Sequence, residues 1–332
     1  MTSTVILTGA NSSVGIPAAE QLLKEYPQNT VIFTVRNADK ADINTEALRQ
    51  VILRYPEAKA SIHQVDLANL SAVHEFASKI SAAVEDGEYP ALKSIMCCAC
   101  HWDLVGDSKL TQDGYDITMQ VNHISHVALV LRLLGSFASD GRIVLFSTVG
   151  HYRKPNAMTS YLPDIPDDMD ELNHPPISDD KKGRGFQRYA NSKLVITTWM
   201  YPLSRYLNQD PRFKNISVVA INPGGLGDSR CFTSNTPLSV QLTQTFILKP
   251  FMPIIRRLAD PTFRSSAEAA SDVVKLAVDE EYQGEQGYFT LLEKDDSDPL
   301  TMDERVQERV WQKSLRWARI TKDNTALKNA FE

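Results

Sequence analysis

Short apolar runs alternate with longer segments of helical period along this chain. Six of the runs have the length and β-branched content of buried strands, at residues 4–8, 30–35, 60–65, 92–97, 142–147 and 216–221. Amphipathic helical patterns follow the first three runs and separate the later ones. Because near-continuous apolar strands that alternate with helices form parallel sheets covered on both faces, the pattern predicts a doubly wound α/β (Rossmann) fold, as a single domain over residues 1–332.

Two segments depart from this alternation. Residues 151–185 contain five prolines and the acidic run 166–171, which predicts a long surface insertion. Residues 301–320 carry apolar side chains at roughly helical spacing. This spacing predicts a C-terminal helix docked on the domain.

A third segment, residues 239–258, is strongly apolar and ends in Arg256-Arg257. It is compatible with a core-facing pair of helices broken at Pro250 and Pro253, with a substrate lid, or with a surface that contacts a membrane.

Composition and charge narrow the class of protein. Hydrophobic residues make up 42% of the chain and charged residues 23%, as in soluble globular proteins. The formal net charge of −6 provides no basic field for nucleic acid or anionic lipid, so we expect no nucleic-acid partner. No apolar run is long enough to span a membrane, and the first residues lack the pattern of a secretory signal. We therefore expect a cytoplasmic protein.

The cysteines and histidines do not predict a metal site. Three of the four cysteines, Cys97, Cys98 and Cys100, lie within four positions, which excludes a spaced disulfide framework. Adjacent cysteines at a strand end cannot easily surround a tetrahedral ion. His123 and His126 share a helix face, but no third ligand is evident.

The turn after the first strand is glycine-rich, Thr8-Gly-Ala-Asn-Ser-Ser-Val-Gly15. Where a strand turns directly into a helix, backbone N–H groups and the helix dipole favour a pyrophosphate, and glycine lets the ligand approach the backbone. The turn therefore predicts a dinucleotide site formed by Gly9, Asn11, Ser12, Ser13, Val14 and Gly15. An ordinary βα turn is the alternative.

The end of the second strand distinguishes the two nicotinamide dinucleotides. A carboxylate there accepts hydrogen bonds from the adenosine ribose, whereas a cation pairs with a 2′-phosphate. Val35-Arg36-Asn37 offers no carboxylate, and the planar guanidinium of Arg36 can bind phosphate through two N–H groups. The sequence predicts NADP(H) as the cofactor; a solvated surface arginine is the alternative.

Tyr189-Ala-Asn-Ser-Lys193 lies at the start of a long helical pattern. Residues four apart share a helix face, so the ammonium of Lys193 can stand beside the phenol of Tyr189. A nearby cation stabilises the phenolate and brings the pKa of the phenol toward the range that acid–base catalysis requires. The pair is a candidate catalytic centre, although the same spacing also occurs on ordinary helix surfaces.

These motifs resemble the short-chain dehydrogenase/reductase family, whose fingerprint is Thr-Gly-x-x-x-Gly-x-Gly; Ser13 stands in place of the middle glycine. The resemblance covers almost the whole chain and is closest to retinol dehydrogenase-like and fungal ketosteroid reductase-like members. It implies that Tyr189 and Lys193 are catalytic and contact the cofactor. It also implies that Thr148, rather than its neighbour Ser147, supplies the catalytic hydroxyl, and that Asn122 bends its helix and holds a water connecting to the lysine.

The same resemblance implies further cofactor contacts. Asp66 and Leu67 would meet the adenine, Pro223-Gly224 the nicotinamide, and Ala99 the adenosine ribose. Ala99 belongs to Cys97-Cys98-Ala99-Cys100, which stands where the family has Asn-Asn-Ala-Gly. Asp228 stands where a threonine commonly meets the carboxamide, and residues 233–264 correspond to the substrate lid.

The reaction implied is reduction of a ketone by NADPH, or oxidation of the matching secondary alcohol, on a bulky hydrophobic small molecule such as a steroid-, terpenoid- or polyketide-like metabolite. A non-redox isomerase, lyase or cyclase that uses Tyr189 as an acid–base, and an NADP(H) sensor without catalysis, remain as alternatives. Peripheral membrane contact and a homo-oligomer are further possibilities.

Overall fold

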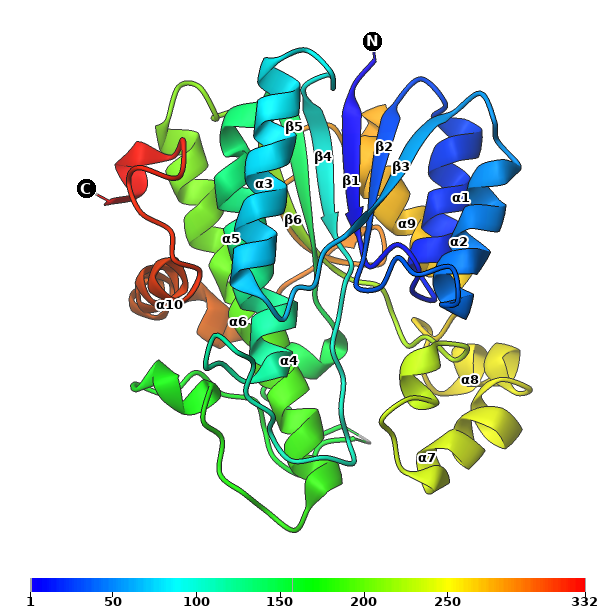
Figure 1. Ribbon diagram of the computed structural model, residues 1–332. Helices are drawn as coiled ribbons and strands as arrows, with labels where there is room; N and C mark the ends of the chain where they lie inside the picture. The colour runs from blue at the N-terminus through cyan, green and yellow to red at the C-terminus, as the bar shows by residue number, and fades with distance from the viewer. Residues whose placement is uncertain (1, 157, 332) are drawn as a thin grey trace.

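The computed structural model describes residues 2–156 and 158–331, and one eight-stranded sheet forms its centre (Figure 1). The strand order is β3-β2-β1-β4-β5-β6-β7-β8, and all neighbours are parallel except β7 and β8. The strands are β1 Thr4–Thr8, β2 Thr30–Val35, β3 Lys59–Gln64, β4 Leu92–Cys97, β5 Phe137–Phe146, β6 Ser217–Asn222, β7 Gly287–Thr290 and β8 Glu293–Lys294. The predicted doubly wound α/β fold is confirmed.

Helices cover both faces of the sheet, as Figure 1 shows. Alternate strand residues explain the two layers: Ile6 packs into the core on one face, while Val5 and Leu7 pack into the core on the other. The first core contains α3 (Leu70–Glu85), α5 (Ser125–Leu133), α6 (Lys181–Gln209) and α10 (Glu304–Trp317), and the second contains α1 (Gly15–Glu25), α2 (Ile43–Leu53) and α9 (Ser266–Val278). Helix α10 packs on α6, where Trp199 and Trp311 stack at 5.9 Å between ring centroids. Within the described residues, no helix is long and apolar enough to cross a membrane.

The sheet differs from its predicted outline at three strands. Strand β5 begins at Phe137, five residues before the expected start, because Phe137 pairs with Leu92 of β4 although the intervening residues are not apolar. Strands β7 and β8 were not predicted, since they have only four and two residues. Such short strands depend on their neighbours rather than on a pattern of their own: β7 pairs with β6, and β8 pairs with β7.

Helix α6 begins at Lys181, eight residues before Tyr189, which corrects the predicted start of the helix. The carboxylate of Asp180 caps it by accepting the Gly183 N–H at 2.8 Å. The last five residues of the expected 151–185 insertion therefore belong to α6. The rest of the insertion is irregular except for short 3₁₀ turns, one of them at Met169–Leu172, and residue 157 lies outside the described residues.

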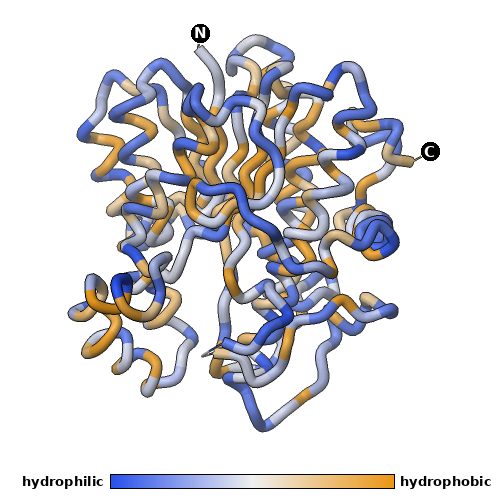
Figure 2. The backbone as a smooth tube through the Cα atoms, turned by 180° about the vertical axis from the view of Figure 1, so that it is seen from behind, coloured by the Kyte–Doolittle hydropathy of each residue, from blue (hydrophilic) through white to orange (hydrophobic). Residues whose placement is uncertain are grey.

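The apolar segment forms a separate helical layer beside the carboxyl ends of the strands. It consists of α7 (Leu238–Thr243), the π-helical turn η6 (Gln244–Leu248) and α8 (Met252–Leu258), drawn in yellow in Figure 1. No residue of α7 or α8 is buried, so a core-facing helix pair is wrong. Figure 2 shows the hydrophobic colouring of this layer, whose exposed large side chains are Leu238, Leu242, Phe246, Ile247, Phe251, Ile254 and Leu258.

Candidate active site

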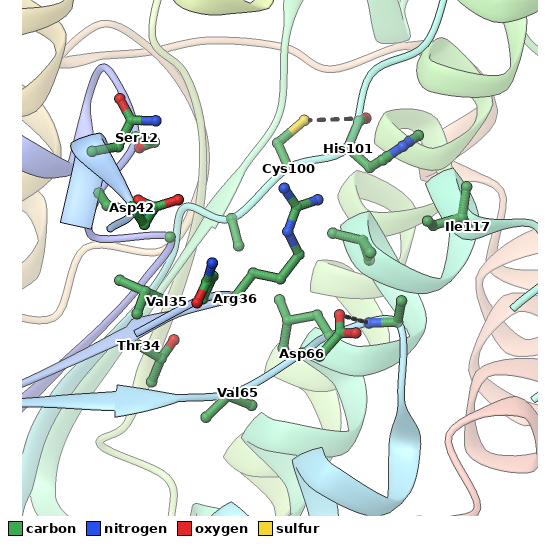
Figure 3. Close-up of a pocket in the computed structure, with 18 of the residues that line it drawn as sticks. Ser12, Thr34, Val35, Arg36, Asp42, Val65, Asp66, Cys100, His101 and Ile117 are labelled. Atoms are coloured by element: carbon green, nitrogen blue, oxygen red, sulfur yellow. Dashed lines mark hydrogen bonds between the residues drawn. The ribbon is translucent and has the colours of Figure 1, made fainter. Parts of the chain in front are cut away.

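A cavity of about 250 Å³ opens at the carboxyl ends of β1, β2, β3 and β4 (Figure 3). In open α/β sheets, ligands bind in the crevice outside these strand ends. Of the residues predicted to bind the cofactor, those that line the cavity are Gly9, Asn11, Ser12, Arg36, Asp66, Leu67 and Ala99. The wall also contains Thr34, Asn37, Asp42, Asn44, Cys100, His101 and Arg230.

The glycine-rich turn between β1 and α1 is tightly packed. Gly9 has φ +62°, and a Cβ on it would lie 2.7 Å from the Cα of Ala99. A Cβ on Gly15 would lie 2.4 Å from the carbonyl oxygen of Gly9. Side chains at these two positions would force the turn away from the cavity, so the backbone path that could hold a pyrophosphate depends on both glycines.

Three predicted residues of this turn do not line the cavity: Ser13, Val14 and Gly15. The hydroxyl of Ser13, which stands in place of a glycine, accepts the backbone N–H of Arg230 at 3.0 Å. The N–H of Gly15 donates to the hydroxyl of Ser12 at 2.9 Å. Ser13 therefore anchors a loop that follows β6 instead of facing the cavity.

Arg36 and Asp66 both line the cavity, after the neighbouring strands β2 and β3. Figure 3 shows the guanidinium of Arg36 pointing into the cavity between Cys100 and Asp66. Arg36 is exposed, and it forms no ion pair with any residue that the structure describes. Asp66 accepts the N–H of Ala68 at 2.9 Å and shapes the turn after β3. A free guanidinium at the end of β2 suits an anionic ligand group.

Tyr189 lies on α6 beside the strand ends, surrounded by aromatic rings. Its ring centroid is 4.8 Å from that of Trp102 and 6.3 Å from that of Phe186. Burial raises the pKa of the Tyr189 phenol well above its ordinary value, and the thiols of Cys100 and Cys231 act in the same direction. A hydrogen bond with Thr148 opposes these effects by lowering the pKa. The expected lowering of the phenol pKa by Lys193 is therefore not found, because burial dominates, and the phenol is protonated at neutral pH, as a proton donor must be.

Thr148 and Ser147, at the end of β5, point in different directions. The hydroxyl of Thr148 reaches the Tyr189 phenol and also accepts the Gly150 N–H at 3.3 Å. The hydroxyl of Ser147 is buried and bonds that of Thr197 at 2.7 Å. The structure thus brings Thr148, and not Ser147, to Tyr189.

Lys193 lies one turn after Tyr189 and is almost fully buried. Its Nζ donates to the carbonyl oxygen of Phe146 at 2.8 Å and lies 5.8 Å from the centroid of the Tyr189 ring. The carbonyl fixes the ammonium against the end of β5. The side chain is held beside the phenol by both its helix and the sheet.

Asn122 lies in the π-helical turn η1 (Gln120–Ile124) between the short helix α4 (Ile117–Met119) and α5, so the helix is irregular at the predicted position. Its Oδ1 accepts the His101 N–H at 2.6 Å, and its Nδ2 donates to the Ser192 hydroxyl at 2.9 Å. Ser192 in turn donates to the carbonyl oxygen of Tyr189 at 2.6 Å. Asn122 therefore joins the loop after β4 to α6 at the tyrosine.

The loop after β6 carries the second side of the site. Pro223 and Gly224 begin it but do not line the cavity, and Asp228 caps α9 by accepting the N–H and hydroxyl of Ser266 at 2.8 and 2.7 Å. Phe232, later in the same loop, lies 6.0 Å from Trp102 between ring centroids. This loop and the one after β4 therefore meet next to Tyr189.

Sequence reasoning missed Arg230 and left the position of Trp102 in the site open. Arg230 lines the cavity although its side chain comes from the loop after β6, and Trp102 donates its indole N–H to Thr236 at 3.1 Å. Neither belongs to a motif. The sequence signal for Arg230 was its position, a few residues after Pro223-Gly224. This position does not predict which way the side chain points.

Two buried histidines, His123 in η1 and His126 in α5, are neutral. His123 bonds the Ser314 hydroxyl at 2.7 Å, and His126 bonds the Thr8 hydroxyl at 3.0 Å. Burial lowers the pKa of His123 to about 3 and that of His126 to about 4. In the described part of the chain, no three His, Cys, Asp or Glu side chains are arranged to hold a metal ion.

Because of these buried histidines, we expect the free energy of unfolding to decrease as the pH falls. Below its ordinary pKa of about 6.5, each histidine is protonated in the unfolded chain but not in the native one, so stability falls as pH drops. From pH 7 to pH 5 we expect a loss of about 2 kcal/mol for each buried histidine, measured by denaturant unfolding. His123→Gln should flatten this dependence, and a stability that is constant over the range would contradict the prediction.

The parallel nucleotide-binding sheet, the glycine turn and the tyrosine, lysine and hydroxyl at its edge together define an oxidoreductase. The family profile described as short chain dehydrogenase matches residues 3–162, and one described as AcuH dehydrogenase domain matches residues 230–327. The chain belongs to the short-chain dehydrogenase/reductase family, whose members bind nicotinamide cofactors.

The relatives include fungal and animal enzymes. Short-chain dehydrogenase iccH of Talaromyces variabilis is 29% identical over 98% of each chain, and retinol dehydrogenase 13 of Mus musculus is 27% identical over 94% of this chain and 83% of its own. The solved structure of the angucycline C-6 ketoreductase LanV with bound NADP shares the fold, with a TM-score of 0.56 and 18% identity over 87% of this chain and 94% of that one. The predicted family resemblance is confirmed.

Proposed function

We propose that this oxidoreductase reduces a ketone on a bulky hydrophobic small molecule with NADPH as the reductant, or oxidises the corresponding secondary alcohol. The observation that carries the proposal is the convergence of Thr148, Tyr189 and Lys193 at a protonated phenol. The aromatic rings of Trp102, Phe186 and Phe232 beside it favour an apolar substrate.

The residues present fit a nicotinamide dinucleotide. Gly9 and Gly15 allow the tight backbone path of the turn, because a Cβ on either would collide with neighbouring backbone, and the free guanidinium of Arg36 suits a 2′-phosphate. The bound NADP of the LanV ketoreductase, which shares the fold, supports this choice. When bound, the reduced cofactor supplies a hydride.

The side chains would act on the substrate oxygen. Thr148 donates a hydrogen bond that holds the carbonyl, and Tyr189 transfers its phenolic proton to the oxygen as negative charge develops there. The ammonium of Lys193 stabilises the resulting phenolate. Asn122, through Ser192, fixes the backbone of α6 at the tyrosine and would support the return of a proton from water.

The test is a screen of hydrophobic cyclic ketones with NADPH and with NADH, followed by the absorbance of the reduced nicotinamide. We expect stoichiometric NADPH consumption with the formation of an alcohol. Product formation without NADPH consumption would overturn the proposal in favour of a non-redox isomerase, lyase or cyclase. NADPH binding without turnover of any ketone or alcohol would favour a sensor.

The cofactor choice gives a separate prediction at Arg36. Replacing Arg36 by Gln removes a charge-assisted bond to the 2′-phosphate, so the Kd for NADPH should rise about ten- to a hundredfold. The Kd for NADH should change less than about threefold. Titration calorimetry measures both, and an equal change in the two constants would assign Arg36 no role in selectivity.

A further inference from the structure

A second arginine reaches the cavity from a distant part of the chain. The backbone N–H of Arg230 donates to the Ser13 hydroxyl, while its guanidinium donates to the carbonyl oxygen of Asn11 and to the side-chain oxygen of Asn44. Arg230 therefore bridges the turn after β1 and the start of α2. It lines the same cavity as Arg36.

The charge of Arg230 has no anionic partner at contact distance. Both acceptors of its guanidinium are neutral, and no ion pair involving Arg230 occurs among residues 2–156 and 158–331. Burial lowers the pKa of Arg230, and the negative charge of Asp42 opposes this shift. A partly buried cation without a contacting anion is costly, so a bound anion would stabilise this arrangement.

The contacts of the Arg230 guanidinium place it between two elements of the cavity wall. It donates to the carbonyl oxygen of Asn11 in the glycine turn and to the side-chain oxygen of Asn44 at the start of α2. A pyrophosphate would lie at the start of α1, whereas Arg36 lines the cavity at the end of β2, the strand that precedes α2. Asp42, the cap of α2, also lines the cavity and interacts electrostatically with both arginines.

We propose that Arg230 is a second specificity-determining residue that, together with Arg36, binds the 2′-phosphate of NADP(H). This proposal rests on the cofactor assigned above. A dianionic phosphate between two guanidinium groups gains charge-assisted bonds from both, whereas an unmodified ribose leaves both cations without an anion. The Oδ1 atom of Asp42 already accepts a hydrogen bond from the Thr45 N–H at 2.7 Å.

The position of Arg230 also connects cofactor binding to the reaction site. Two residues later Phe232 packs against Trp102, which in turn contacts Tyr189. A phosphate held by Arg230 therefore anchors the loop that forms the aromatic wall beside the phenol.

The experiment is a double-mutant-type cycle. It compares the effect on Kd of removing the 2′-phosphate from the ligand with the effect of removing the guanidinium from the protein. Calorimetry measures Kd for NADPH and NADH, and for 2′,5′-ADP and ADP, with the native chain, Arg230→Gln, Arg230→Lys and Arg36→Gln. Arg257→Gln is the matched control, because Arg257 is exposed on α8 and does not line the cavity.

We expect Arg230→Gln to weaken NADPH and 2′,5′-ADP about ten- to a hundredfold while NADH and ADP change less than about threefold. Arg230→Lys should recover part of the loss, and Arg257→Gln should have no effect. An equal loss for both cofactors would place Arg230 at the pyrophosphate and overturn the proposal, and so would unchanged binding. If Arg36→Gln alone alters selectivity, the proposal fails while the assignment of NADP(H) stands; if the native chain binds neither dinucleotide, that assignment fails.

Discussion

Replacing Tyr189 by Phe should lower turnover of any ketone substrate by about 10²- to 10⁴-fold, the usual contribution of a positioned acid–base group. The change removes the phenolic proton that the site places beside Thr148 and Lys193. The ring remains, so its packing against Trp102 at 4.8 Å is retained. Steady-state kinetics with NADPH as the reductant measure the effect.

Direct binding provides the control for this variant. The Tyr189 phenol does not line the dinucleotide cavity, so the Kd for NADPH should stay within about threefold of the native value. A loss confined to kcat identifies a group that acts on the reacting oxygen. Turnover within tenfold of the native chain would rule out Tyr189 as the proton donor.

Replacing Thr148 by Val should lower kcat about 10²- to 10³-fold, because it removes the hydrogen bond expected to hold the substrate oxygen while keeping the shape of the side chain. Thr148→Ser keeps the hydroxyl and should recover most of the activity. Kinetics of both variants with the same ketone measure the difference.

Ser147→Ala is the matched control at the neighbouring position. The Ser147 hydroxyl bonds Thr197, which also donates to the Lys193 carbonyl oxygen at 2.7 Å and so keeps a partner. We expect activity within about threefold and a stability loss of about 0.5–1.5 kcal/mol. If Ser147→Ala impairs kcat more than Thr148→Val, the two hydroxyls have the opposite roles.

The local motifs of the site are properties of short segments. The spacing of Tyr189 and Lys193 places both on one helix face, and the glycine turn follows directly from a strand into a helix. Such features depend on a few neighbouring residues, so they are visible in the sequence. The alternation of strands and helices likewise predicted the parallel sheet.

The apolar segment at residues 239–258 shows why a pattern of apolar residues alone does not place a segment in the fold. An apolar stretch broken by prolines has the same composition whether it packs into a core or lies on a surface. The structure decided between these arrangements, because α7 and α8 lie beside the carboxyl ends of the strands and contain no buried residue. Strands β7 and β8 are similar, because their few residues form strands only where a neighbouring strand pairs with them, β6 with β7 and β7 with β8.

The sequence by itself determined the doubly wound fold, the family and the candidate residues on each motif, because hydrophobic periodicity and short-range geometry act within single elements. The tertiary structure decided which groups meet. It turned Thr148 rather than Ser147 toward Tyr189, and it hydrogen-bonded Ser13 to the loop after β6. It also brought Arg230 to the cavity that Arg36 lines, although the two arginines are more than 190 residues apart in the sequence. These contacts depend on side-chain direction and on loops that cross the sheet edge, which no local pattern encodes.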